Sequence, residues 1–266
     1  YGGHTDVVPP GPEDEWTFPP FKPTIQNGVL YGRGASDMKG SVAAFTAAIS
    51  AFINKHGAPE NGSISMLITG DEEADAINGT VKVLEWMKEN DQVPDVALVG
   101  EPTNPDHLGQ EIKIGRRGSL CGHLTVTGQQ GHVAYPHLAA NPVKGIVAAL
   151  ATLYGTPLDE GSVHFAPSNF EVTSIDVGNP ATNVIPARAE ARFNIRFNDN
   201  HDPDSLKERL RAQVTSSLAS TGLRYALDFA PHGDVFVTEP GDLDALLGEA
   251  VTTVTGRTPV LSTDGG

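Results

Sequence analysis

Residues 63–73 read Ser-Ile-Ser-Met-Leu-Ile-Thr-Gly-Asp-Glu-Glu, a short apolar run that ends in acidic side chains. The run over 63–69 predicts a buried strand, and Glu72 and Glu73 follow its end. A second apolar run, at 95–99, leads in the same way to Glu101. Open α/β sheets bind ligands at the carboxyl ends of their strands. These three glutamates are therefore expected at one edge of a sheet.

Two further segments add metal-binding side chains to that edge. His4 and Asp6 lie in the opening Tyr-Gly-Gly-His-Thr-Asp, which reads as a strand end, and Asp37 lies in Gly-Arg-Gly-Ala-Ser-Asp-Met-Lys-Gly. One imidazole and several carboxylates suit Zn²⁺ or a related ion, and such sites activate water. We therefore predict a dinuclear metal site in which Asp37 bridges two ions. The ordinary alternatives are a helix cap for Asp37 and a solvated surface for Asp6 and the glutamate pair.

The first part of the chain reads as alternating strands and helices. A loop over 9–34 carries a short hairpin at Asn27-Gly28. Helices are predicted over 37–53 and 80–89, the second with Val83, Leu84 and Met87 on one face. Strands that alternate with helices imply a largely parallel sheet, so the fold class is α/β.

The pattern changes after residue 117. Residues 188–197 alternate strictly between apolar and polar, which is typical of a half-buried strand. With the neighbouring segments, this gives the order β-α-β-β-α-β of a ferredoxin-like α+β domain. Strands are predicted at 120–127, 170–177 and 188–197, and helices from Asn141-Pro142 to 153 and from Asp202-Pro203 to 218. We expect a domain inserted at 118–231, between catalytic segments at 1–117 and 232–266, with a returning helix at 243–255.

Composition narrows the function classes. The formal net charge of -15 argues against binding to a nucleic-acid backbone, and no run of about 20 apolar residues predicts a membrane helix. The single cysteine, Cys121, excludes an internal disulfide, is expected to be buried, and fits a reducing cytoplasm. The chain begins at Tyr1 rather than Met and stops within a loop, so we expect a fragment that lacks both termini.

The motifs resemble those of the dinuclear zinc hydrolases that include aminoacylases, acetylornithine deacetylases and succinyl-diaminopimelate desuccinylases. Within this family, the last group is the most similar. The matching strings run from end to end of the chain, and beside the two around His4 and Asp37 they are Gly-Asp-Glu72-Glu73-Ala-Asp-Ala-Ile-Asn-Gly-Thr, Gly-Glu101-Pro-Thr, Gly-Arg116-Arg117-Gly-Ser, Gly-His132-Val-Ala-Tyr-Pro-His137 and Asn183-Val-Ile-Pro-Ala.

The resemblance implies a zinc-exopeptidase-like catalytic domain with two Zn²⁺ ions, Co²⁺ being an alternative at one site. His4, Asp37 and Glu101 would hold one ion. Asp37 and Glu73 would hold the other, with a histidine expected beyond residue 266. Glu72 would be the general base, and the peptide bond after Asp37 would be cis. Asp6 would hold the ring of His4, as carboxylates behind metal ligands do.

The inserted domain would be a lid and dimerisation domain, through which the chain forms a homodimer. His132 would reach the partner's site and stabilise the oxyanion. Arg116, Asn183 and Arg196 would contact an N-succinyl amino acid substrate, because arginine forks match carboxylates. The ordinary alternatives are a solvated turn for Arg116 and a cross-strand partner for Arg196.

These implications favour release of succinate from N-succinyl-LL-2,6-diaminopimelate in lysine and diaminopimelate synthesis. The alternatives are an acetylornithine deacetylase or another N-acyl amino acid hydrolase, and a non-catalytic dimeric relative. A metal-binding shell alone does not need Glu72, which argues against the non-catalytic alternative. We expect no nucleic-acid or membrane partner.

Overall fold

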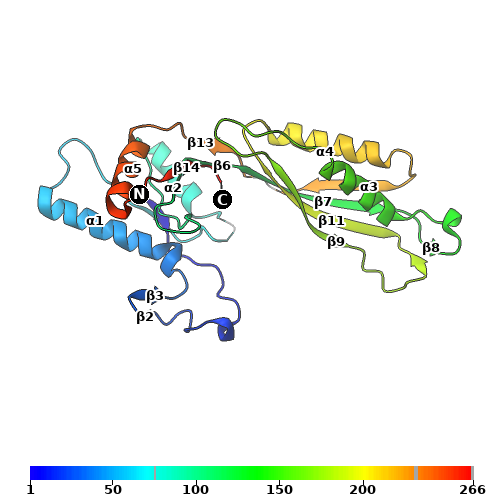
Figure 1. Cartoon of the computed structure of the whole chain (residues 1–266), viewed down its shortest axis with the longest axis horizontal. Coiled ribbons are helices and arrows are strands. Elements are labelled where there is room, and N and C mark those ends of the chain that lie inside the picture. The colour runs from blue at the N-terminus through cyan, green and yellow to red at the C-terminus, as the bar shows by residue number, and fades with distance from the viewer. Residues whose placement is uncertain (75, 231–232, 265–266) are drawn as a thin grey trace. The chain divides into compact units, whose positions relative to one another are not determined.

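The computed structural model describes residues 1–74, 76–230 and 233–264. Two compact units divide the chain, Tyr1–Asn104 and Pro105–Gly266 (Figure 1). Each unit is described by itself below. The expected domain boundaries after residues 117 and 231 stay predictions, and the second lies outside the described residues.

The first unit has short strands and two long helices. Strands β1 and β4 pair in parallel, with His4 opposite Thr69. Strands β2 and β3 form the predicted hairpin, whose turn residues Asn27 and Gly28 have φ values of 52° and 79°. The elements are β1 (Gly2–His4), η1 (Glu13–Glu15), β2 (Thr24–Gln26), β3 (Val29–Tyr31), η2 (Ala35–Lys39), α1 (Gly40–His56), β4 (Leu67–Thr69) and α2 (Thr80–Glu89).

The two strands predicted beside the glutamates are shorter than expected. Only Leu67–Thr69 of the segment 63–69 forms a strand, and Ile64 is exposed. The segment 95–99 forms no strand; a single bridge joins Val99 to Gly2, and Val99 is exposed. The prediction of two buried strands was therefore wrong in extent, because a strand needs a hydrogen-bonded neighbour that an apolar run alone does not supply.

The helices of this unit begin close to their predicted positions. The bounds of α2 match the prediction, although Met87 is buried while Leu84 is exposed. Helix α1 begins at Gly40, and Asp37 before it has the non-helical angles φ -110° and ψ 106°. No side chain caps α1 at Lys39. Asp37 is thus not a helix cap and stays available for another role.

The second unit contains an antiparallel sheet of four strands in the order β12-β7-β11-β9. Helices α3 and α4 cover one face of this sheet (Figure 1). The chain follows the predicted order β-α-β-β-α-β. The elements are β7 (Gly118–Thr127), α3 (Pro142–Tyr154), β9 (Asn169–Asp176), β11 (Arg188–Phe197), α4 (Pro203–Leu218) and β12 (Arg224–Phe229).

Alternating side chains build the core of this sheet. Strand β11 has the predicted bounds, and its alternate residues from Ala189 to Phe197 are buried. Leu206, Leu210, Val214 and Leu218 of α4 pack on them at four-residue steps. Asn141 caps α3 by accepting a hydrogen bond from the Val143 amide at 3.0 Å.

Short strands, a short 3-10 helix and helix α5 complete the second unit. Strands β5 and β14 pair in parallel, β6 pairs with β13, and β8 pairs with β10, both antiparallel. The elements are β5 (Glu111–Lys113), β6 (Gly115–Arg116), β8 (Gly131–His132), η3 (Pro136–Leu138), β10 (Val184–Ile185), β13 (Phe236–Val237), α5 (Asp242–Thr255) and β14 (Val260–Ser262). The parallel pairing expected of the α/β part is present as separate two-stranded pairs.

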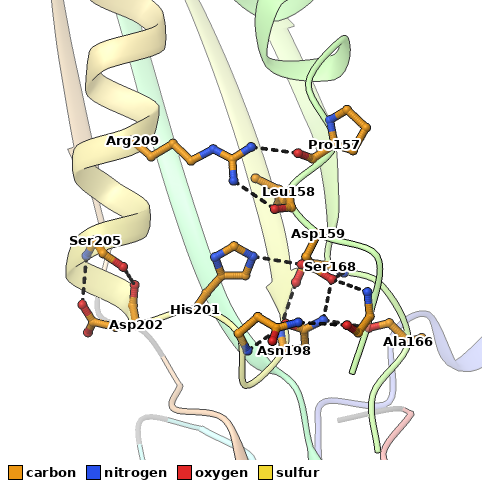
Figure 2. Close-up of polar contacts among 12 residues, drawn as sticks. Pro157, Leu158, Asp159, Ala166, Ser168, Asn198, His201, Asp202, Ser205 and Arg209 are labelled. Atoms are coloured by element: carbon orange, nitrogen blue, oxygen red, sulfur yellow. Dashed lines mark hydrogen bonds and ion pairs between the residues drawn. The ribbon is translucent and has the colours of Figure 1, made fainter. Parts of the chain in front are cut away.

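A partly buried carboxylate, that of Asp159, connects the loop after α3 to the junction of β11 and α4 (Figure 2). Asp159 Oδ1 accepts hydrogen bonds from the amides of Gly161 (2.7 Å) and Ser168 (3.2 Å) and from Asn198 Nδ2 (2.6 Å). Its Oδ2 lies 2.9 Å from His201 Nε2. Burial alone raises the pKa of Asp159, but hydrogen bonds from Ser168, Gly161 and Asn198 outweigh it and hold that pKa well below 3.8.

One expectation about side-chain burial was wrong. Cys121 is exposed, because it alternates with the buried Leu120 on β7 and so lies on the sheet face that the helices do not cover. Among the described residues, no helix is both long enough and apolar enough to span a membrane.

Candidate metal centre

Three segments bring their functional side chains together within the first unit. His4 ends β1, Asp37 lies in the kinked turn before α1, and Glu101 follows the bridge at Val99. The pairing of β1 with β4 then brings the residues after Thr69 to the same end. This is the arrangement that the strand-end argument predicts, although it is built on two short strands and a single bridge.

The ligand atoms of His4, Asp37 and Glu101 all lie within 4.8 Å of one another. His4 Nε2 lies 3.1 Å from Asp37 Oδ1, 3.3 Å from Glu101 Oε1 and 3.8 Å from Glu72 Oε2. The imidazole is 2 % exposed, whereas the carboxylates are partly open to solvent. One buried nitrogen and two convergent carboxylate oxygens form a donor set that divalent zinc accepts.

Asp6 contacts the other side of this group. His4 Nδ1 lies 3.1 Å from the backbone carbonyl oxygen of Asp6 and 3.3 Å from its Oδ1. Asp6 Oδ2 accepts hydrogen bonds from the backbone amides of Glu72 at 2.9 Å and Glu73 at 3.0 Å. The predicted contact between Asp6 and His4 is present, whereas the two amide contacts were not predicted.

The charges of the cluster change its acid–base properties. Burial raises the pKa of Glu101, and the nearby carboxylate of Asp37 raises it further. Burial lowers the pKa of His4, but the hydrogen bond to the Asp6 carbonyl and the charges of Glu101, Glu72 and Asp37 outweigh burial and raise it. The carboxylates crowded around the imidazole contribute to both shifts. A divalent cation among these groups would offset that repulsion.

Lys39 makes a hydrogen bond beside the metal centre that the sequence analysis did not predict. Its Nζ donates a hydrogen bond to the carbonyl oxygen of Thr5 at 3.2 Å and so links the turn after Asp37 to the residue after His4. The ammonium crosses Gly34, where a Cβ atom would lie 2.2 Å from Nζ. Gly34 has a φ of 78°, a left-handed backbone conformation that favours glycine.

Two further predictions concern the peptide bond after Asp37 and the role of Glu73. The peptide bond between Asp37 and Met38 is cis, as the resemblance implied. Glu73 is not among the three residues whose ligand atoms converge. Its place at a second metal therefore stays a prediction.

His132 and Asn183 lie side by side in the second unit. His132 is in β8 opposite Val184 of β10, and the Asn183 carbonyl accepts a hydrogen bond from the Val133 amide at 3.1 Å. His132 and Asn183 are both exposed. Val133 is 47 % and Tyr135 58 % exposed, so an apolar surface borders the histidine.

The two arginines lie at the opposite end of the four-stranded sheet. Arg196 pairs in register with Ser119, near the start of β7, and Arg116 precedes that strand. His132 follows the other end of β7, at Thr127. The eight residue steps from Ser119 to Thr127 span about 26 Å. One copy of this unit therefore does not bring His132 and Asn183 together with Arg196.

Comparison with known proteins agrees with the family resemblance. The model of "Peptidase family M20/M25/M40" matches residues 1–266. A succinyl-diaminopimelate desuccinylase of Methylorubrum populi is 52% identical over 267 aligned residues, which cover 100% of this chain and 69% of that protein. One from Rhodospirillum centenum is 55% identical over 266 residues, covering 100% of this chain and 68% of that protein.

Solved structures support the fold. An aminopeptidase PepT from Bacillus cereus has a TM-score of 0.73 at 17% identity, covering 100% of this chain and 66% of that one. The M20 family metallo-carboxypeptidase Sso-CP2 from Sulfolobus solfataricus has a TM-score of 0.70 at 20% identity, covering 99% and 71%. These structures share the α/β fold of the chain. The chain belongs to peptidase family M20/M25/M40, in which it is a homologue of the succinyl-diaminopimelate desuccinylases.

Proposed function

We propose that the chain is a metal-dependent amide hydrolase that removes succinate from N-succinyl-LL-2,6-diaminopimelate and leaves LL-2,6-diaminopimelate. The observation that carries this proposal is the convergence of His4, Asp37 and Glu101 in a chain that matches desuccinylases along its whole length. The reaction belongs to lysine and diaminopimelate synthesis. A cytoplasmic location agrees with the one free cysteine, Cys121.

The donor set fits the proposed zinc ions. His4, Asp37 and Glu101 would hold the first, since nitrogen and carboxylate oxygen are both zinc ligands. Asp37 would bridge to a second ion held also by Glu73, and cobalt is an alternative at one position. When bound, zinc acts as a Lewis acid on the scissile carbonyl and makes water a better nucleophile.

Glu72 would move the proton in this reaction. Its carboxylate faces His4 Nε2 at 3.8 Å and is 49 % exposed, so both water and substrate can reach it. A positioned carboxylate can take the proton of the attacking water and pass it to the leaving amine. Glu73, the next residue, lies in the same bend and would act as a ligand of the second ion.

Substrate carboxylates would be recognised from the second unit. Arg116 is exposed at the end of β6, and Arg196 is half-buried on β11, so both guanidinium groups are open to a ligand. Bidentate pairing would match the several carboxylates of a succinylated diaminopimelate. Asn183 would contact the substrate, and His132 would stabilise the oxyanion.

The register of the sheet supports a dimer that shares its sites. Strand β7 spans about 26 Å from Ser119, opposite Arg196, to Thr127, and His132 follows that far end, so His132 and Asn183 would serve the site of a second copy. The surface beside His132 is suited to contact that copy, because Val133, Tyr135 and Leu138 are exposed there. We therefore propose that residues 118–231 form an inserted, ferredoxin-like lid and dimerisation domain.

The test is hydrolysis of N-succinyl-LL-2,6-diaminopimelate and of N-acetylornithine, each after zinc loading and after chelation. We expect zinc-dependent succinate release and a strong preference for the succinyl compound. Glu72→Gln should lower kcat about 10²- to 10⁴-fold and retain zinc. Glu89→Gln, which changes an exposed carboxylate on α2, is the matched control.

Each other outcome has a definite meaning. Preference for the acetyl compound would move the assignment to an acetylornithine deacetylase. Absence of release from folded protein in which both zinc positions are loaded would refute the hydrolase activity. Unchanged turnover in Glu72→Gln would remove that residue from the mechanism.

A further inference from the structure

The chain loses its strand partner just before the two glutamates. The last ladder contact of β4 is the hydrogen bond from the Thr5 amide to the Thr69 carbonyl, at 2.9 Å. Beyond Gly70, the amides of Glu72 and Glu73 need other acceptors. Both donate to the same atom, Asp6 Oδ2, at 2.9 Å and 3.0 Å.

The backbone carbonyl of Asp6 already serves the ring of His4. That oxygen lies 3.1 Å from His4 Nδ1, nearer than Asp6 Oδ1 at 3.3 Å. Any residue at position 6 would supply the same carbonyl. Within the described residues, Asp6 Oδ1 is buried without a hydrogen-bond partner, so the hydrogen bonds of this carboxylate are made by Oδ2. The side chain of Asp6 thus has two contacts: Oδ1 faces His4 Nδ1 at 3.3 Å, and Oδ2 accepts the hydrogen bonds of Glu72 and Glu73.

We propose that Asp6 is a positioning residue for the Glu72–Glu73 segment, whose backbone it fixes so that the Glu72 carboxylate faces His4. Charge-assisted hydrogen bonds to two consecutive amides are stronger than neutral ones and restrict both residues at once. The side chain of Glu72 is half exposed, so we infer that its orientation depends on the hydrogen bond of its backbone amide to Asp6. The proposal rests on the proposed function only where it calls Glu72 the base.

A neighbouring carboxylate supplies a matched control. Asp71 Oδ2 accepts a hydrogen bond from the amide of Asn78 at 2.8 Å and so fastens the other end of the same loop. Asp71→Ala removes a carboxylate of the same kind one residue from Glu72. It leaves the two hydrogen bonds to Asp6 in place.

The first test is amide hydrogen exchange, resolved by residue, on the 266-residue chain without added metal. In Asp6→Ala, we expect exchange at Glu72 and Glu73 to rise at least about tenfold while α2 keeps its protection. In Asp71→Ala, exchange should rise at Asn78 instead. Unchanged protection at Glu72 and Glu73 in a folded Asp6→Ala protein would overturn the proposal.

A second variant covers a failure of Asp6→Ala to fold. Asp6→Asn has nearly the same shape but a neutral acceptor, so exchange at Glu72 and Glu73 should still rise above that of the unmodified chain. The same rates in both proteins would overturn the proposal. Neither measurement needs substrate, so this result is independent of whether the chain is a desuccinylase.

Kinetics test the consequence for catalysis. In active enzyme, Asp6→Ala should lower kcat with little change in KM, and should lower it no further in a Glu72→Gln background, because both changes act through one base. Equal losses in both backgrounds would show that Asp6 acts on His4 and not through Glu72, which contradicts the catalytic part of the proposal.

Discussion

Removing the carboxylate of Asp159 is the sharpest test of what holds the second unit together. The side chain is 9 % exposed and accepts hydrogen bonds from Gly161, Ser168 and Asn198, while His201 faces its second oxygen (Figure 2). Asp159→Ala removes the acceptor shared by the amides of Gly161 and Ser168 and by Asn198, whose Nδ2 keeps only its hydrogen bond to the Ala166 carbonyl. We expect the second unit to lose stability and the first to keep it.

The expected loss follows from the number and kind of these contacts. A hydrogen bond to a charged group contributes about 1.5–3 kcal/mol, and contacts in one network do not add fully. Removing one partner of a buried pair costs about 3–5 kcal/mol. We therefore expect Asp159→Ala to lower the free energy of unfolding by about 4 kcal/mol. At a urea dependence of about 2 kcal/mol per molar, the midpoint falls by about 2 M.

The two tryptophans allow the units to be followed separately. Trp16 and Trp86 are the only tryptophans of the sequence, and both lie in the first unit. In urea, far-ultraviolet circular dichroism should show an earlier transition for Asp159→Ala, while tryptophan emission should change at the original midpoint. Asp228→Ala, at an exposed position of β12, should change stability by less than about 0.5 kcal/mol.

The pH dependence gives the sign of the effect. The folded-state pKa of Asp159 lies below its ordinary value of 3.8, because hydrogen bonds outweigh burial. Its contribution is thus full above about pH 4 and is lost as the pH falls towards the folded-state pKa. The difference between the unmodified chain and Asp159→Ala should shrink in acid. A difference at pH 7 no larger than that of Asp228→Ala would refute the reasoning.

Three further changes have defined outcomes. Gly122→Ala places a Cβ 2.1 Å from the ring of Phe193 and should lower the free energy of unfolding by about 1–3 kcal/mol in urea titration. Asn141→Ala removes the acceptor of the Val143 amide at the start of α3 and should cost about 1 kcal/mol, measured in the same way. Glu101→Gln should weaken zinc binding at least about tenfold in competition with a chelator, and equal affinity would remove Glu101 from the metal centre.

Sequence pattern predicts the second unit better than the first. Strand β11 has its predicted bounds, and helix α4 begins and ends where it was predicted. Both predictions succeed because alternation and four-residue spacing of apolar residues reflect burial on one face. The segments 63–69 and 95–99 were overestimated, since pairing depends on neighbours that apolar composition does not reveal. The exposure of Cys121 was predictable, because neighbouring residues of a strand point to opposite faces of the sheet and the adjacent Leu120 is buried.

The candidate metal centre was predictable in its residue types but not in its supporting contacts. Strand-end placement brought His4, Asp37 and Glu101 together as expected. The contact from Asp6 to the amide of Glu72 joins positions 66 residues apart, and main-chain donors leave no mark on the sequence. The pattern of side chains therefore predicts the metal-binding residues more readily than it predicts the backbone hydrogen bonds that orient them.

The length of β7 has a genetic consequence if two copies pair as proposed. A chain that lacks His132 would inactivate its partner's site, while its own Arg116 and Arg196 would stay intact. A substitution at one end of the sheet would therefore affect the site of the other subunit. Mixed with a chain defective at Arg196, it would form heterodimers in which one complete site is reconstituted. Two inactive alleles, one without His132 and one without Arg196, would therefore complement each other, and an allele without His132 would impair the site of a normal chain paired with it.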